Sequence, residues 1–187
     1  MSDKFVGKYN TGVVEVEEDC SYFNANYVFG KFVCISRSES YLESTGNSEY
    51  AESCYTKLPV YMLVHSVVRV SVEPFNCPFD SWQWGYICVS EADIRAYFDL
   101  KEDDYIDNNA VHRALIASVA VVDSFLSGDV YTYTVTENNN GDTVASVGGI
   151  TSYEKAVELM KTAVSTADKE YEEREYPLLV ATGTLED

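Results

Sequence analysis

The sequence has few of the features that mark disulfide frameworks, membrane spans or processing signals. Its 187 residues include 5 cysteines, 4 prolines and 2 histidines. The odd cysteine count and the absence of a CxxC pair argue against a disulfide framework or a zinc site, so we expect reduced, mostly buried thiols. No apolar run reaches the roughly 18 residues of a membrane span, and the amino-terminal residues do not resemble a signal peptide. We therefore expect a cytoplasmic protein with no membrane anchor, metal or cofactor.

Basic residues are also scarce. The chain carries 13 Lys and Arg against 31 Asp and Glu, a formal net charge of −18. Such a charge repels phosphates and anionic lipids, so direct binding to nucleic acid or membrane is not expected. Hydrophobic residues make up 46% of the chain and aromatic residues 13%, which is enough to build a core and excludes wholesale disorder.

The order of sequence patterns predicts an α+β fold, with an antiparallel sheet and two to three helices packed on one face. Residues 1–57 are expected to form a β-rich amino-terminal portion or small lobe, and residues 58–187 an α+β core with an acidic carboxyl-terminal helix. Alternating or β-branched runs predict strands at 13–17, 27–35, 60–66, 68–72, 84–89, 130–136 and 143–147.

Three helices are predicted from capping residues and apolar periodicity. They begin near Ser90, near Asp107 and near Ser152, and Gly128 is expected to end the second. Pro177 is expected to end the third, with a short strand after it at 178–180.

Residues suited to covalent catalysis are sparse. His65 could pair with Ser81 and Asp80 only if the fold brings them together, and no GxSxG motif is present. Cys77 is the most plausible reactive thiol, but no basic residue lies near it in sequence to lower its pKa. We therefore expect no enzyme, and keep a small hydrolase as a minor alternative.

Acidic residues concentrate in two segments, 91–107 and 168–175. The first lacks the ligand spacing and the glycine of an EF-hand, so we do not expect it to bind metal. In the second, helical spacing places residues 168, 172 and 175 on one face. Rows of exposed carboxylates can imitate a phosphate backbone, although a solvated, solubilising surface explains them equally well. The candidate partner-binding residues are these acids and two nearby tryptophans: Glu102, Asp103, Asp104, Asp107, Asp168, Glu172, Glu173, Glu175, Trp82 and Trp84.

Two motifs in the middle of the chain resemble those of a known family. Residues 77–85 read CPFDSWQWG, and residues 125–131 read FLSGDVY. In this order they resemble a family of uncharacterised acidic proteins of phages and mobile elements, whose loops read CPWDSGQVG and YLTGDVYGF. The resemblance covers roughly residues 58–150. It implies an origin in a mobile element and, by analogy of charge and size, an anti-restriction or anti-CRISPR character.

The expected function is inhibition of a host defence nuclease, either a CRISPR effector or a restriction enzyme. An acidic, DNA-mimicking surface would occupy the basic cleft of this nucleic-acid-handling protein, with Tyr and Trp as anchors. The alternative is a non-enzymatic phage structural or regulatory protein that binds another protein through an aromatic patch. The sequence leaves open whether the protein is a monomer or a homodimer.

Overall fold

The computed structural model describes residues 3–18, 24–25, 28–36 and 41–181, with side chains described as far as residue 174. The chain forms eight strands and four helices within these ranges, and they build two four-stranded antiparallel sheets. The predicted α+β class is thus confirmed. The predicted single sheet with helices on one face is wrong, because the strands divide between two sheets.

The chain divides into two compact units. The terminal unit joins the two ends of the chain, Met1–Cys20 and Gly128–Asp187, and the central unit is Ser21–Ser127. The expected boundary after residue 57 does not match this division. It falls inside strand β4 (Thr56–Val64), whose ladder is continuous across it.

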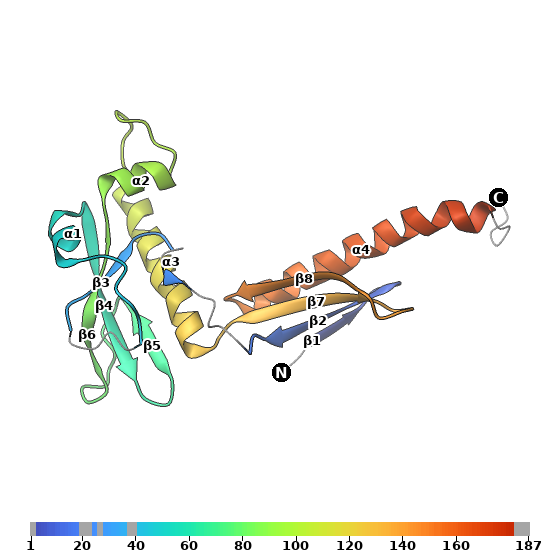
Figure 1. The fold of residues 1–187 in the computed structure, drawn as a ribbon, viewed down its shortest axis with the longest axis horizontal. Helices are drawn as coiled ribbons and strands as arrows, with labels where there is room; N and C mark the ends of the chain where they lie inside the picture. The colour runs from blue at the N-terminus through green and yellow to red at the C-terminus, as the bar shows by residue number, and fades with distance from the viewer. Residues whose placement is uncertain (1–2, 19–23, 26–27, 37–40, 182–187) are drawn as a thin grey trace. The chain divides into compact units, whose positions relative to one another are not determined.

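The terminal unit is a sheet covered on one face by a long helix (Figure 1). Its strand order is β1-β2-β7-β8, so the first strands of the chain pair with strands from its last third. Helix α4 buries Ala156, Met160 and Val164 against Val14 and Val135 of the sheet. The bounds of the elements are β1 Asp3–Val6, β2 Asn10–Val16, β7 Tyr131–Glu137, β8 Thr143–Ile150 and α4 Tyr153–Ala181.

Helix α4 runs past the proline that was expected to stop it. The predicted break at Pro177 and the predicted strand at 178–180 are both wrong, since the helix continues to Ala181. A proline within a helix removes one backbone hydrogen bond and crowds the carbonyl of the residue four positions earlier, but a helix can accommodate this by a kink and need not end there.

The central unit is a second sheet, with strand order β3-β6-β4-β5. Alternate residues of β6 face different neighbours: Ile87 and Val89 join the core formed with α3, while Cys88 packs with Ala51 of α1. Because successive strand residues point to opposite faces, helices pack on both faces of this sheet. The bounds of the elements are β3 Lys31–Cys34, α1 Ser48–Ser53, β4 Thr56–Val64, β5 Val68–Ser71, β6 Ser81–Val89, α2 Glu91–Tyr97 and α3 Asn108–Ser127.

Helix α3 supplies the main apolar stripe of this core. It buries Val111, Leu115, Val119 and Val122, and Gly128 follows it at φ +78°, the left-handed conformation of the predicted C′ glycine. By length and composition α3 could cross a membrane, but core helices pass the same test. Its buried stripe packs with strand residues of the central sheet, so this is weak evidence for a membrane span.

Candidate protein-binding site

Helix α2 begins at a hydrogen-bonded cap that also involves α1. Ser90 Oγ accepts from the Asp93 N–H at 3.1 Å, which confirms the predicted cap. In a complete capping box the Ser90 N–H would donate to the Asp93 carboxylate. Here the Ser90 N–H donates instead to the Tyr50 hydroxyl, at 3.0 Å. Tyr50 and Ser90 both donate to Asp93 Oδ2, at 2.8 and 2.6 Å. These bonds lower the pKa of Asp93, and burial with the bond to Asp93 raises the pKa of Tyr50 to about 12.

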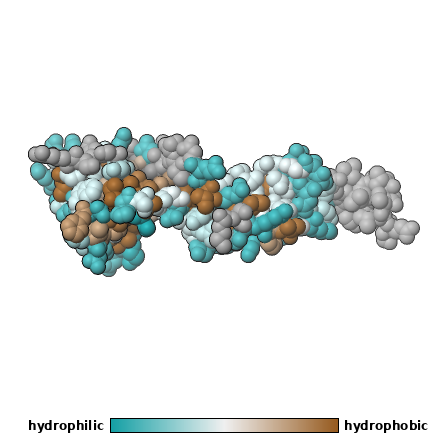
Figure 2. All heavy atoms as spheres, turned by 90° about the horizontal axis from the view of Figure 1, so that it is seen from below, coloured by the Kyte–Doolittle hydropathy of each residue, from teal (hydrophilic) through white to brown (hydrophobic). Residues whose placement is uncertain are grey.

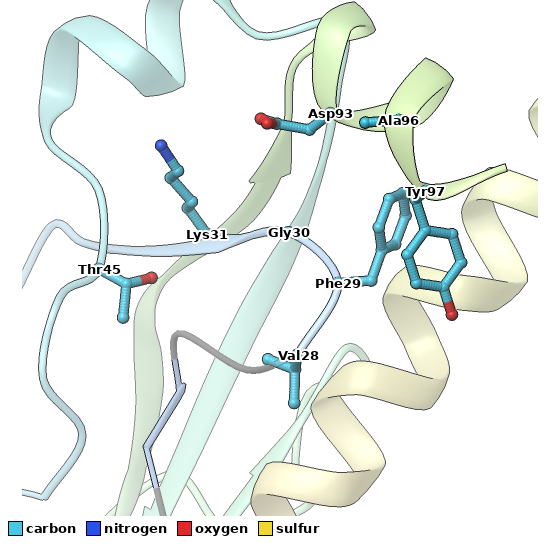
Figure 3. Close-up of a pocket in the computed structure, with 8 residues that line it drawn as sticks. All are labelled: Val28, Phe29, Gly30, Lys31, Thr45, Asp93, Ala96 and Tyr97. Carbon is cyan, nitrogen blue, oxygen red and sulfur yellow. The ribbon is translucent and has the colours of Figure 1, made fainter. Parts of the chain in front are cut away.

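A pocket of about 430 Å³ opens beside this cap (Figure 3). Its aromatic wall is Phe29 and Tyr97, whose ring centroids lie 4.4 Å apart, and Tyr97 is 60% exposed. Figure 3 shows the charged groups, Lys31 and Asp93, on the other side of the pocket from these rings. Lys31 Nζ lies 4.5 Å from the centroid of the Tyr50 ring. The pocket therefore offers aromatic and charged groups together, a combination suited to anchoring a side chain of a partner.

The segment that follows α2, residues 99–107, is here called the acidic loop. It holds five carboxylates and one lysine. Arg95 of α2 holds the backbone of this loop, because its Nη1 donates hydrogen bonds to the carbonyl oxygens of Lys101 and Asp104. The buried side chain of Ile106 ties the far end of the loop to the core. The loop is therefore anchored at two points and holds its outward side chains in a defined arrangement.

Two of the four predicted acids in this loop serve the backbone, and two point outward. Asp104 Oδ2 accepts from the Lys101 N–H at 2.7 Å, and Asp107 Oδ1 accepts from the Asn109 N–H at 2.9 Å at the start of α3. Glu102 and Asp103 are exposed, and within the described residues neither accepts a hydrogen bond. The side chain of Tyr105, which lies between Asp104 and Asp107 in the sequence, is 82% exposed.

The predicted acidic row on α4 has a different role. Asp168 lies against the β1–β2 turn and accepts four hydrogen bonds of 2.6–3.0 Å, from the backbone N–H groups of Lys8, Tyr9 and Asn10 and from the Asn10 side chain. Burial alone would raise the pKa of Asp168, but these hydrogen bonds outweigh it and lower the pKa. Asp168 is therefore a structural acceptor, which corrects its prediction as a partner-binding residue.

Other members of the row divide between an internal contact and solvent. Glu172 accepts from Lys8 Nζ at 2.6 Å, and this bond raises the pKa of Lys8. Residues 168 and 172 thus do share one face, as predicted, but that face meets the β1–β2 turn. Glu173 is exposed, and the side chain of Glu175 lies outside the described part of the structure.

The predicted pair of tryptophans does not form a contact patch. Trp84 is completely buried and its ring centroid lies 6.4 Å from that of Phe32, while Trp82 is half-buried against the same core. Because they differ by two positions on β6, both rings point to the same face, and that face is the interior. On the face shown in Figure 2, hydrophobic residues lie at the surface among hydrophilic ones.

The residues considered for catalysis are not joined into a catalytic arrangement. The Ser81 hydroxyl donates to the Cys77 carbonyl, and the Cys77 thiol lies 3.7 Å from Asp80 Oδ2. No hydrogen bond among the described residues links the His65 imidazole to Ser81 or Cys77. Among all residues that the structure describes, no group of three His, Cys, Asp or Glu side chains is placed to hold a metal ion.

Two features of this region were not identified from the sequence. The first is Arg95. Its spacing of four residues from Glu91 in the sequence indicates an ion pair on a helix, and in the structure Arg95 Nη2 lies 2.8 Å from Glu91 Oε1. The second is the pocket wall, for which no sequence signal exists, because Phe29 and Tyr97 belong to segments far apart in the chain.

Comparison with known proteins adds no family or fold relationship. No family model matches the chain, and neither curated proteins nor solved structures gave a match. The resemblance of residues 77–85 and 125–131 to phage proteins therefore stays a prediction.

Proposed function

We propose that the protein is a non-enzymatic inhibitor of phage or mobile-element origin. It binds the basic nucleic-acid cleft of a host defence nuclease, a CRISPR effector or a restriction enzyme, through the acidic loop. The observation that carries the proposal is the fixed display of Glu102 and Asp103 beside Tyr105, which is 82% exposed.

The physical case rests on preorganisation. Each exposed carboxylate carries one negative charge, like a phosphate of DNA, so a cluster of them suits a cleft lined with Lys and Arg. A flexible acidic segment would lose conformational entropy on binding, whereas a loop held by Arg95 and Ile106 has already lost most of it. The net charge of −18 adds long-range attraction to a basic partner and raises the association rate.

The aromatic residues supply the short-range part of the interface. Tyr105 lies within the loop, and Tyr97, the last residue of α2, lines the pocket. Exposed tyrosines bury large areas at low entropic cost and often dominate binding energy. We therefore assign them the role that the sequence suggested for the tryptophans.

One observation favours a second function, that of a structural or regulatory phage protein that binds another protein through aromatic contacts. The pocket beside Tyr97 contains a lysine as well as a carboxylate, which gives it a mixed character rather than that of a phosphate mimic. Binding centred on this pocket would be largely insensitive to salt.

Affinity capture with mass spectrometry distinguishes the two functions. Tagged protein is incubated with bacterial lysate and washed at about 0.05 to 0.5 M salt, with or without competitor duplex DNA. We expect capture of a DNA-binding nuclease or effector that is released by salt and by DNA. A partner that resists both supports the second function and contradicts the first.

A further inference from the structure

Two cysteines of the central unit lie together in a small secondary core. Cys88 of β6 is completely buried, in a cluster with Val33 and Ala51, and Cys54 packs against this cluster. This core lies on the face of the sheet opposite to α3 and contains none of the residues of the acidic loop. It is therefore separate from the acidic loop, and it touches the α2 cap through Tyr50.

The backbone brings the two cysteines together. Cys54 is the C-cap of α1, and the next residue, Tyr55, donates its N–H to the Val89 carbonyl of β6 at 2.9 Å. Lys57 then lies directly opposite Cys88 in the β4–β6 ladder. The end of α1 is thus held beside the strand that carries Cys88.

Cys54 is placed at the edge of the cluster that contains Cys88, and its Sγ donates to the carbonyl of Ala51, another member of that cluster, at 3.4 Å. The two thiols are close enough for Cys54 to affect the pKa of Cys88. Burial, reinforced by the neighbouring Cys54, raises the pKa of Cys88 to about 12. Because Cys88 is completely buried and Cys54 is only half-buried, Cys54 is the thiol that an oxidant reaches first.

We propose that Cys54 and Cys88 are a redox pair that forms an intramolecular disulfide when the protein meets hydrogen peroxide. The Cys54 thiolate attacks one peroxide oxygen, the O–O bond breaks, and the products are Cys54 sulfenic acid and, after protonation, water. The Cys88 sulfur then attacks the Cys54 sulfur and displaces the hydroxyl group, which takes up the Cys88 proton and leaves as a second water. In total, two thiols lose two electrons and two protons, and hydrogen peroxide is reduced to two molecules of water.

The bond would fix the end of α1 to β6 and close a loop of about 35 residues. A loop of this length restricts the unfolded chain substantially, so the oxidised protein should be more stable than the reduced protein. We expect the melting temperature of the central unit to rise on the order of 10 °C. Helix α1 also carries Tyr50, so the disulfide would stiffen the support of the α2 cap.

Peptide mapping after oxidation tests the proposal. Cys77 and Cys88 lie in one tryptic peptide, between Arg69 and Arg95, so the experiment uses the full chain with Cys77→Ser. This protein is treated with hydrogen peroxide, its remaining thiols are blocked with N-ethylmaleimide, and it is digested without reductant. We expect a linked pair of peptides that contain Cys54 and Cys88, lighter by two hydrogens than their sum and separated by dithiothreitol.

Two variants serve as matched controls. Cys54→Ser should fold, because Cys54 is only half-buried, and should lose both the linked peptides and the oxidant-dependent rise in melting temperature. Cys34→Ser, also half-buried, should keep both. The proposal is overturned if peroxide leaves Cys54 and Cys88 unlinked, takes Cys54 only to the sulfinic acid, or links either cysteine mainly to another one.

Discussion

The two acidic segments of the chain are similar in composition and different in use. In the acidic loop, Glu102 and Asp103 face solvent from a framework fixed by Arg95. In α4, Asp168 faces inward and accepts four hydrogen bonds, and Glu172 binds Lys8. Glu102 and Asp103 of the loop are therefore available to a partner, while Asp168 and Glu172 of α4 hold the terminal unit together.

This difference arises from the groups that lie within reach of each carboxylate. Gly7 begins the turn that meets Asp168, and a Cβ at that position would clash with Asp168 Oδ2. Only a residue without a side chain lets the helix come this close to the turn. The acidic loop has no such partner segment among the described residues. Charge density in a sequence thus does not reveal whether a carboxylate is displayed or used internally.

The largest expected effect comes from removing the internal carboxylate. Asp168→Ala should lower the free energy of unfolding by about 2–4 kcal/mol, because it leaves the N–H donors of the turn and the buried Asn10 amide without their acceptor. Urea unfolding followed by circular dichroism measures this. Glu170→Ala, an exposed position on the same helix, should change the value by less than about 0.5 kcal/mol. Equal effects at the two positions would remove the contrast between internal and displayed acids.

Acid should weaken the protein through the same groups. The pKa values of Asp168 and Asp93 are lowered in the folded state, so the unfolded chain binds more protons as the pH falls. Their stabilisation is complete above the ordinary aspartate pKa of about 3.9 and is lost as the pH falls through the folded values. Urea midpoints between about pH 5 and pH 2 should decline less steeply in Asp168→Asn and in Asp93→Asn than in the wild type. Parallel curves for all three proteins would show that neither carboxylate is coupled to folding.

A smaller effect is expected at the exposed ion pair of α4. The side chains of Lys8 and Glu172 are 65% and 49% exposed, so solvent screens their attraction. Glu172→Gln should cost less than about 1 kcal/mol, and the cost should shrink further in about 1 M salt. A large loss that persists in high salt would place Glu172 with Asp168 as an essential internal acceptor.

The smallest effect on stability is expected in the acidic loop. The double variant Glu102→Gln and Asp103→Asn should unfold within about 0.5 kcal/mol of the wild type, since it removes like charges and breaks no described hydrogen bond. Thermal and urea unfolding both measure this. A loss above about 1 kcal/mol would show that these carboxylates are structural as well.

Local patterns in the sequence predicted much of the secondary structure. The Ser90 cap, the α3 stripe and Gly128 were all identified, because each depends on residues within a few positions of one another. The division into two units was not, because it depends on β2 pairing with β7, which brings Asn10 opposite Glu137. Helix α1 was also missed, because no helix was predicted before Ser90. Its six residues include one buried side chain, too few for a periodic pattern.

The candidate site was predicted in part, and for similar reasons. The loop acids Glu102 and Asp103 could be found from composition, because exposure is the ordinary state of a charged side chain. The burial of Trp84 and the role of Asp168 could not, since the first depends on which face of β6 meets α3 and the second on a turn at the other end of the chain.

The most direct test of the account compares capture by two proteins that differ only in where their charge is reversed. One carries Glu102→Lys and Asp103→Lys in the acidic loop, and the other carries Glu170→Lys and Glu173→Lys on the exposed side of α4, so both gain the same charge. The account predicts that the α4 variant still captures a DNA-binding partner that duplex DNA releases, and that the loop variant does not. Equal capture by the two variants, or loss with the α4 variant alone, would contradict the assignment of the acidic loop as the binding surface.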